Sequence, residues 1–214
     1  MNDSAPVRGH EAPRSGQRWP EGWTKLHVYL TALEEVKTLA DSYRPVIDEA
    51  PGDVPVPHEW LHATIASAEC DAAQIPEETR ARLIERLRER LGRHPAFDLT
   101  VGPALASMSA IMLDTFPDRD FQGLVTTCVE VIDEVVDGRV GRPCSGAGHV
   151  SLSYRPETAG DDQARGHVQN HLRDIRPGRV KIPVTAVELV RVFQNRDASS
   201  YTWETLARIA LGQR

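Results

Sequence analysis

The 214-residue sequence has few cysteines, no long apolar run and an excess of acidic over basic residues. Its three cysteines, Cys70, Cys128 and Cys144, are odd in number and lack metal-site spacing, which favours reduced thiols over a disulfide framework. No apolar run approaches the roughly 18 residues that a membrane helix needs, and no charged-then-apolar signal sequence opens the chain. We therefore expect a cytoplasmic protein that makes no use of a membrane.

The charge balance limits the kinds of binding partner that the protein can have. Twenty-five Lys and Arg residues against 31 Asp and Glu give a net charge of −6, whereas coating a nucleic-acid backbone requires a basic face. This argues against wholesale nucleic-acid binding but is compatible with a local pocket for one phosphate. The 40% hydrophobic and 26% charged fractions are ordinary for a globular protein, and the length allows one large domain or two compact lobes. We expect a monomer.

The pattern along the chain predicts helices alternating with strands. Residues 1–22 are rich in Pro, Gly, Ser and charge without an apolar period, so we expect a disordered leader before a single domain at 23–214. Apolar spacing predicts helices within 33–47 (stopped by Pro45), 76–91, 121–136 and 161–175. Alternation predicts strands at 25–31, 97–101, 109–114 and 149–154, with a closing pair at 180–194 and 201–211. Pro183 should lie at a sheet edge or bulge. This order suggests a two-lobed α/β or α+β domain.

The stretch VPVPHEWLHATIA, residues 54–66, admits two chemistries. His58 and His62 match H-E-x-x-H, in which two histidines on one helix bind zinc and the glutamate is a general base. Pro55 and Pro57 immediately precede the motif and oppose a helix that starts before Pro57, and the third histidine of the longer peptidase pattern is absent. If the segment is instead a strand, His62 and Thr64 point to the same face.

The strand interpretation requires a second half-site, and the sequence contains a matching motif. His149-Val150-Ser151-Leu152 again gives His, any residue, a hydroxyl and an aliphatic residue, in a strand that follows a turn. One such match is expected by chance in this chain, so the matched context of the two motifs carries the inference.

These two motifs, LHATIA at 61–66 and HVSLSY at 149–154, resemble those of the 2H phosphoesterases, and within them the bacterial 2′-5′ RNA ligase-like proteins or RNA 2′,3′-cyclic phosphodiesterases. The resemblance extends over nearly the whole chain from Trp23, with Ser151 in place of the commoner Thr. It implies an α+β fold of two pseudo-symmetric lobes, each an antiparallel sheet with outer helices, around a central groove that both motifs face.

The resemblance also implies the site. His62 and His149 would be the catalytic acid and base, because imidazoles near pKa 6.5 can take and give protons at neutral pH. Thr64 and Ser151 would bind the phosphate by donating hydrogen bonds to its non-bridging oxygens. Such a scheme needs no metal and no cofactor, and the substrate would be the 2′,3′-cyclic phosphate or 2′-5′ linkage of an RNA end or small nucleotide.

Other side chains are weaker candidates. His27, Tyr29, Tyr154 and Arg155 are candidate groove-lining residues. Trp60, like Tyr154, could stack a base, and Arg191, like Arg155, could neutralise a phosphate. Two alternatives stay open at this point: a nucleotide or RNA-end binding module without turnover, and the H-E-x-x-H zinc hydrolase.

Overall fold

The computed structural model describes residues 19–137, 140–141, 148–155, 162–195 and 200–212. The helices are α1 (Glu34–Asp48), α2 (Glu77–Leu91), α3 (Asp118–Val135) and α4 (Asp162–Asp174), with short 3₁₀ helices η1 (His58–Trp60) and η2 (Ala72–Gln74). The strands are β1 (Thr24–Thr31), β2 (Val54–Pro55), β3 (His62–Ala68), β4 (Phe97–Ala106), β5 (Ala110–Phe116), β6 (Val140–Gly141), β7 (His149–Tyr154), β8 (Val180–Val184), β9 (Ala186–Asn195) and β10 (Ser200–Ala210).

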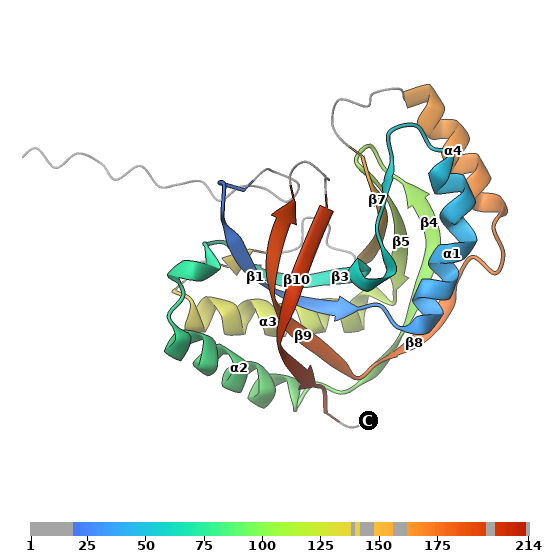
Figure 1. The fold of residues 1–214 in the computed structure, drawn as a ribbon. Coiled ribbons are helices and arrows are strands. Elements are labelled where there is room, and N and C mark those ends of the chain that lie inside the picture. The colour runs from blue at the N-terminus through green and yellow to red at the C-terminus, as the bar shows by residue number, and fades with distance from the viewer. Residues whose placement is uncertain (1–18, 138–139, 142–147, 156–161, 196–199, 213–214) are drawn as a thin grey trace, which may run out of the picture.

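The strands form two five-stranded sheets, which confirms the expected α+β class with two antiparallel lobes. The first sheet has the order β10-β9-β1-β3-β6 and is covered by α2 and α3. The second has the order β2-β7-β5-β4-β8 and is covered by α1 and α4. Figure 1 shows the two helix pairs on the outer sides of the molecule, with the sheets between them.

The two lobes are interleaved along the chain. Each sheet takes strands from both the N-terminal and the C-terminal half of the sequence, and α1 packs on the second sheet although it follows β1 of the first. The first motif begins β3 and the second begins β7, so each sheet carries one motif. The two motifs therefore occupy equivalent places in the two lobes. Neither lobe, however, is formed by one half of the sequence.

Apolar periodicity explains the helices, including one that continues past its proline. In α2, Leu83, Leu87 and Leu91 recur every four residues and form its buried stripe. The expectation that Pro45 stops this helix is wrong. α1 continues past Pro45 to Asp48, and Ile47 in this last part is only 2% exposed. Pro45 removes one backbone hydrogen-bond donor, and the burial of Ile47 offsets that loss.

Two strand predictions needed correction. The segment 180–194 is not one strand, because the chain leaves the second sheet after Val184 and enters the first at Ala186. Pro183 lies in β8, which is an edge strand as expected, since an edge position tolerates the missing N–H. β4 continues beyond Val101 to Ala106 across a register irregularity that contains Gly102.

The described fold begins four residues before Trp23. Trp19 is 7% exposed and packs in an apolar cluster with Tyr29, Val190 and Val192. Its backbone N–H donates to Gln194 Oε1 at 2.8 Å. The expected leader boundary at residue 22 is therefore too late for Trp19, whereas residues 1–18 lie outside the described part of the chain. No helix within the described ranges has the length and apolarity needed to cross a membrane.

Candidate active site

The first motif lies on β3, which alternates between the core and the inner face of its sheet. Ala63 and Ile65 are fully buried in the main core. His62 and Thr64 therefore face the other side, because successive strand side chains alternate. Thr64 lies opposite Tyr29 in the register with β1, so these two side chains share that inner face.

His62 lies in an aromatic environment. Its ring stacks on Tyr29 with 3.9 Å between centroids and contacts the Trp203 ring edge-on at 5.0 Å. Its Nδ1 is 2.9 Å from the Trp60 carbonyl oxygen, which can only accept, so Nδ1 carries the proton and Nε2 is left as the titrating nitrogen. Burial is the main cause that lowers the pKa of His62 to about 4; the Trp60 hydrogen bond opposes this shift and the His149 charge adds to it. His62 is therefore a neutral imidazole at pH 7.

The H-E-x-x-H interpretation is wrong in its structural requirement. His58 lies in η1, which ends at Trp60, and His62 begins a strand, so the two histidines do not share a helix. The His58 Nε2 atom instead lies 2.7 Å from Asp41 Oδ1 on α1. Within the described ranges, no three His, Cys, Asp or Glu side chains gather as a metal site would require.

The second motif lies on β7 with the same alternation and a different environment. Val150 and Leu152 are buried in the core, and His149 and Ser151 are half-buried on the opposite face. His149 lies directly opposite Asp114 of β5, and paired side chains in an antiparallel ladder lie about 5 Å apart at Cβ. Asp114 thus lies on the strand beside His149, where its Oδ1 accepts a hydrogen bond from the Thr115 N–H, whereas His62 has aromatic neighbours.

A glycine is required immediately before β7. A Cβ at Gly148 would lie 2.5 Å from Thr115 Oγ1 and 2.8 Å from the Phe121 ring. The Thr115 hydroxyl donates to the Gly148 carbonyl oxygen at 2.8 Å. This close packing against β5 and α3 fixes the position from which His149 projects.

The two motif strands are brought together between the lobes. β3 and β7 contact each other although they belong to different sheets. In agreement with this contact, the charge of His149 contributes to the lowered pKa of His62. Each motif hydroxyl also has a tyrosine partner, since side-chain hydrogen bonds join Thr64 to Tyr29 and Ser151 to Tyr154.

His27 and Tyr29 both lie on the inner face of the first sheet. Tyr29 is 1% exposed, and burial raises the pKa of its phenol well above the usual value. His27 lies between Trp19 and Tyr29, with ring centroids 5.8 and 5.2 Å away, and both its ring nitrogens are buried without a hydrogen-bond partner. Burial, followed by the charges of His62 and Lys25, lowers the pKa of His27 to about 3. His27 is thus part of the floor beneath His62 and stays neutral at pH 7.

Tyr154 lines an apolar pocket beside the motifs. Its ring contacts Tyr201 of β10 edge-on at 5.6 Å and so joins the two sheets. Trp60, which also lines this pocket, contacts the Trp203 ring edge-on, with 4.8 Å between centroids. The pocket is lined by Val54, Pro55, Val56, Pro57, Trp60, Tyr154, Ser200 and Tyr201.

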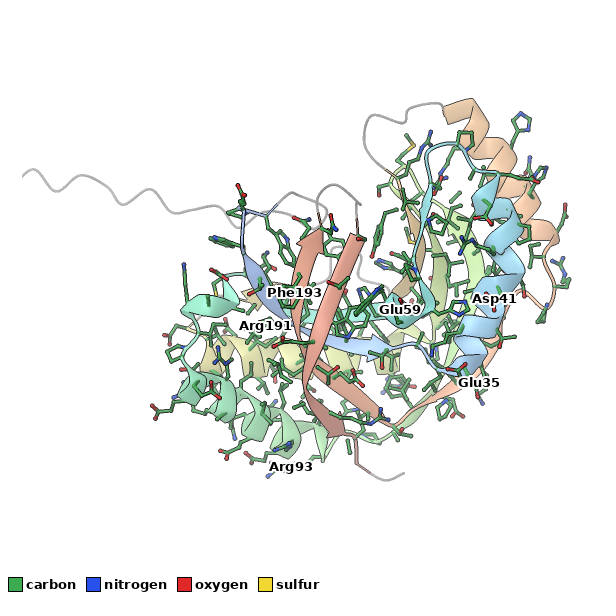
Figure 2. All side chains as sticks on the ribbon, in the orientation of Figure 1. Glu35, Asp41, Glu59, Arg93, Arg191 and Phe193 are labelled. Atoms are coloured by element: carbon green, nitrogen blue, oxygen red, sulfur yellow. The ribbon has the colours of Figure 1, made fainter. Side chains whose placement is uncertain are left out.

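The arginine candidates are not in this pocket. Arg155 is 7% exposed, its backbone N–H donates to the Ser109 carbonyl, and it is not a lining residue. Arg191 forms an ion pair with Glu204 at 2.8 Å and lies over the Phe193 ring at 5.4 Å. Figure 2 shows Arg191 and Phe193 close together on the β9–β10 side of the first lobe. Arg191 is thus engaged in a surface pair.

Sequence reasoning missed the part of the site contributed by distant segments. Trp203 and Tyr201 lie on the last strand, 141 and 139 residues after His62, and Trp19 lies before the expected domain start. The alternation of Tyr201, Trp203 and Thr205 predicts that they share one face of a strand. It does not reveal that β9 and β10 place this face beside β1 and β3.

Comparison with known proteins gives one kind of match. No family model and no curated protein sequence matches the chain. Among solved structures, one described as a phosphoesterase has a TM-score of 0.66 at 18% identity, covering 89% of this chain and 99% of its own. Escherichia coli LigT in complex with NADP+ has a TM-score of 0.62 at 19% identity, covering 89% and 99%. This chain shares the fold of LigT.

LigT in complex with 3′-AMP is similar as well, with a TM-score of 0.61 at 16% identity, covering 88% of this chain and 98% of that one. The match over nearly the whole of both chains agrees with the two-lobed architecture expected from the motifs. At these identities the likeness establishes the fold and leaves the chemistry to the residues of this chain.

Proposed function

We propose that this protein is a metal-independent 2H phosphoesterase that opens 2′,3′-cyclic phosphates, or acts on 2′-5′ linkages, of RNA ends or small nucleotides. The observation that carries the proposal is the pair of His-x-hydroxyl strands, β3 and β7, which meet between two lobes of a phosphoesterase fold. Neither strand alone would support it, since a lone histidine on a strand is more often a packed residue.

The two environments assign different roles to the histidines. His62 is neutral with its Nε2 lone pair available, so we assign it as the general base that takes a proton from water. The water oxygen then attacks phosphorus, and the bond from phosphorus to one ribose oxygen breaks. His149, opposite the Asp114 carboxylate, is assigned as the acid that protonates that departing oxygen. The product is a phosphomonoester with a free ribose hydroxyl.

The two hydroxyls would hold the phosphate during this reaction. Thr64 and Ser151 each lie two residues after their histidine on the same strand face, so a phosphate between the imidazoles would meet both. Their O–H groups can donate to the non-bridging oxygens, where negative charge concentrates in the transition state.

The aromatic side chains beside the motifs support a nucleoside as the substrate. Trp60, Tyr154 and Tyr201 supply aromatic surface on which a base can stack, and stacking tolerates any base because all bases have a π face. Trp60 also holds His62 through its carbonyl, and Tyr154 follows Ser151 by three residues on β7. A base stacked on these rings would therefore lie beside the proposed phosphate site.

The direct experiment is a screen of the four nucleoside 2′,3′-cyclic phosphates and of cyclic-phosphate-ended oligonucleotides, each with and without EDTA. We expect turnover that survives chelation, because the proposed acid, base and donors are all side chains. Turnover lost in EDTA and restored by zinc would favour metal-assisted hydrolysis. Nucleotide binding without turnover of any substrate would show a binding module instead of an enzyme.

A further inference from the structure

A buried ion pair lies on the far side of the second sheet from the proposed site. Arg165 of α4 places Nη1 2.5 Å from Asp53 Oδ2, and the two side chains are 7% and 0% exposed. Removing charges from water is costly unless their hydrogen bonds are satisfied, so a pair this buried requires further partners.

Those partners belong to the elements that build the pocket wall. The Ser153 hydroxyl of β7 donates to Asp53 Oδ1 at 2.5 Å and accepts from the Ile111 N–H of β5 at 3.1 Å. The Arg165 Nε–H donates to the Ser107 carbonyl, in the turn between β4 and β5, at 2.6 Å. The pair therefore joins α4, β5 and β7 to Asp53, which immediately precedes β2.

β2 is a minimal strand that pairs with β7 and packs on α1. It has two residues, Val54 and Pro55, and it is the edge strand of its sheet. Proline has no N–H to give to the ladder, so the next regular bond is the Val56 N–H to the Leu152 carbonyl at 2.8 Å. Yet residues 54–57 form one wall of the apolar pocket.

We propose that the Asp53–Arg165 pair is a positioning device that sets the wall at 54–57 against Tyr154 and thereby determines how tightly the protein binds a nucleobase. This inference rests on the proposed function, because it assumes that a base stacks on the aromatic rings beside residues 54–57. Ser153 and Tyr154 are adjacent and point to opposite faces of β7, so the pair acts through the backbone from behind the pocket. It touches neither motif hydroxyl nor histidine.

The test compares a ligand with a base and one without. Adenosine 3′-monophosphate and ribose 3-phosphate are titrated by calorimetry into the wild type and into the double variant Asp53→Asn/Arg165→Met, which removes both charges together. We expect Kd for the nucleotide to rise about tenfold, a fraction of what base stacking is worth, and Kd for ribose 3-phosphate to change less than about twofold. The milder variant Ser153→Ala should shift the nucleotide in the same direction by about threefold.

The matched control is Arg44→Met/Asp48→Asn, which makes the same substitutions in an exposed pair on α1 and should leave both dissociation constants unchanged. Equal weakening of both ligands in the double variant and in Ser153→Ala would overturn the proposal in favour of a purely structural pair. So would a wild type that binds both ligands equally. Cyclic-phosphate turnover is measured separately, so an inactive wild type that still binds the nucleotide more tightly would sink the enzymatic proposal and leave this one standing.

Discussion

The motif strands β3 and β7 carry the same residue pattern in different surroundings. Around His62 are the rings of Tyr29 and Trp203 and a backbone carbonyl, whereas His149 is half-buried opposite Asp114. An apolar shell favours a neutral imidazole, and a nearby carboxylate favours a charged one. Two copies of one motif can therefore supply a base and an acid, because the neighbouring strands differ while the motif does not.

The difference originates outside the motifs. The shell of His62 comes from β1 and β10, on the first sheet, and it continues through His27 to Trp19. On the second sheet the strand beside β7 supplies a carboxylate at the matching position. The lobes are thus equivalent in architecture and unequal in electrostatics, and the following changes test that inequality.

The largest effect should come from removing either histidine. His62→Ala and His149→Ala should each lower kcat by about 10²- to 10⁴-fold, the usual contribution of one positioned acid or base. The double variant should be scarcely worse than the worse single variant, because acid and base act as a unit. His58→Ala is the matched control, since that histidine pairs with Asp41 outside the site, and it should retain wild-type kcat.

The same two variants should differ in their pH profiles. A base must be deprotonated and an acid protonated, so kcat/KM of the wild type should rise through the pKa of His62, near 4, and fall at higher pH. His62→Ala should lose the acidic limb and His149→Ala the basic one. If His62→Ala instead loses the basic limb, the roles are reversed and the comparison of environments has misled us.

The next largest effect should be the loss of stability on removing the Trp19 side chain. Trp19→Ala exposes the cluster that continues to His27 and Tyr29, and truncating a buried tryptophan typically costs about 3 kcal/mol of unfolding free energy. Urea unfolding of this variant measures the loss. Deletion of residues 1–18 is the control and should leave the free energy of unfolding within about 0.5 kcal/mol. If Trp19→Ala were as stable as the wild type, Trp19 would not be a stabilising member of the cluster.

Smaller losses are expected at the hydroxyls. Thr64→Ala and Ser151→Ala should each lower kcat about tenfold, with little change in KM, if the hydroxyls hold charge that develops in the transition state. Thr64→Ser and Ser151→Thr keep the O–H group and serve as controls that should stay within about threefold of wild type. A rise in KM with kcat unchanged would mean that the hydroxyls bind the ground state equally well.

The last comparison concerns the pH dependence of stability. His27 is neutral in the folded state, with its pKa near 3, and takes up a proton near pH 6.5 when unfolded. Its contribution therefore lowers the free energy of unfolding as pH falls below about 6.5, by up to about 1.4 kcal/mol per pH unit. Melting curves from pH 7.5 to 5 should show a shallower decline for His27→Phe than for wild type. Parallel curves would contradict a buried, neutral His27.

Local patterns predicted much of the fold because the responsible forces are local. The stripe of Leu83, Leu87 and Leu91 indicated α2, and the alternation in HVSLSY predicted β7 with the observed ends. The boundary errors arose where tertiary contacts prevailed, as at Pro45, where burial of Ile47 extends α1, and at Trp19, whose partners lie on β1 and β9.

The candidate site divides in the same way. Both motifs were found because each is a short strand pattern with its own periodicity. The aromatic shell of His62 was not predicted, because Trp203 and His62 come together only when the strands assemble in the order β10-β9-β1-β3. Asp114 was missed for the same reason, since no local signal pairs it with His149.

The interleaving of the lobes has a consequence for dividing the chain. A break in the sequence between β5 and α3 would leave β1 and β3 without β9 and β10, and β4 without β8. Each fragment would expose unpaired strand edges, which promote aggregation. The two pieces should therefore be insoluble when expressed singly and recover a folded protein only when produced together, so this fold is suited to a split reporter in which reassembly of the fragments restores both sheets at once.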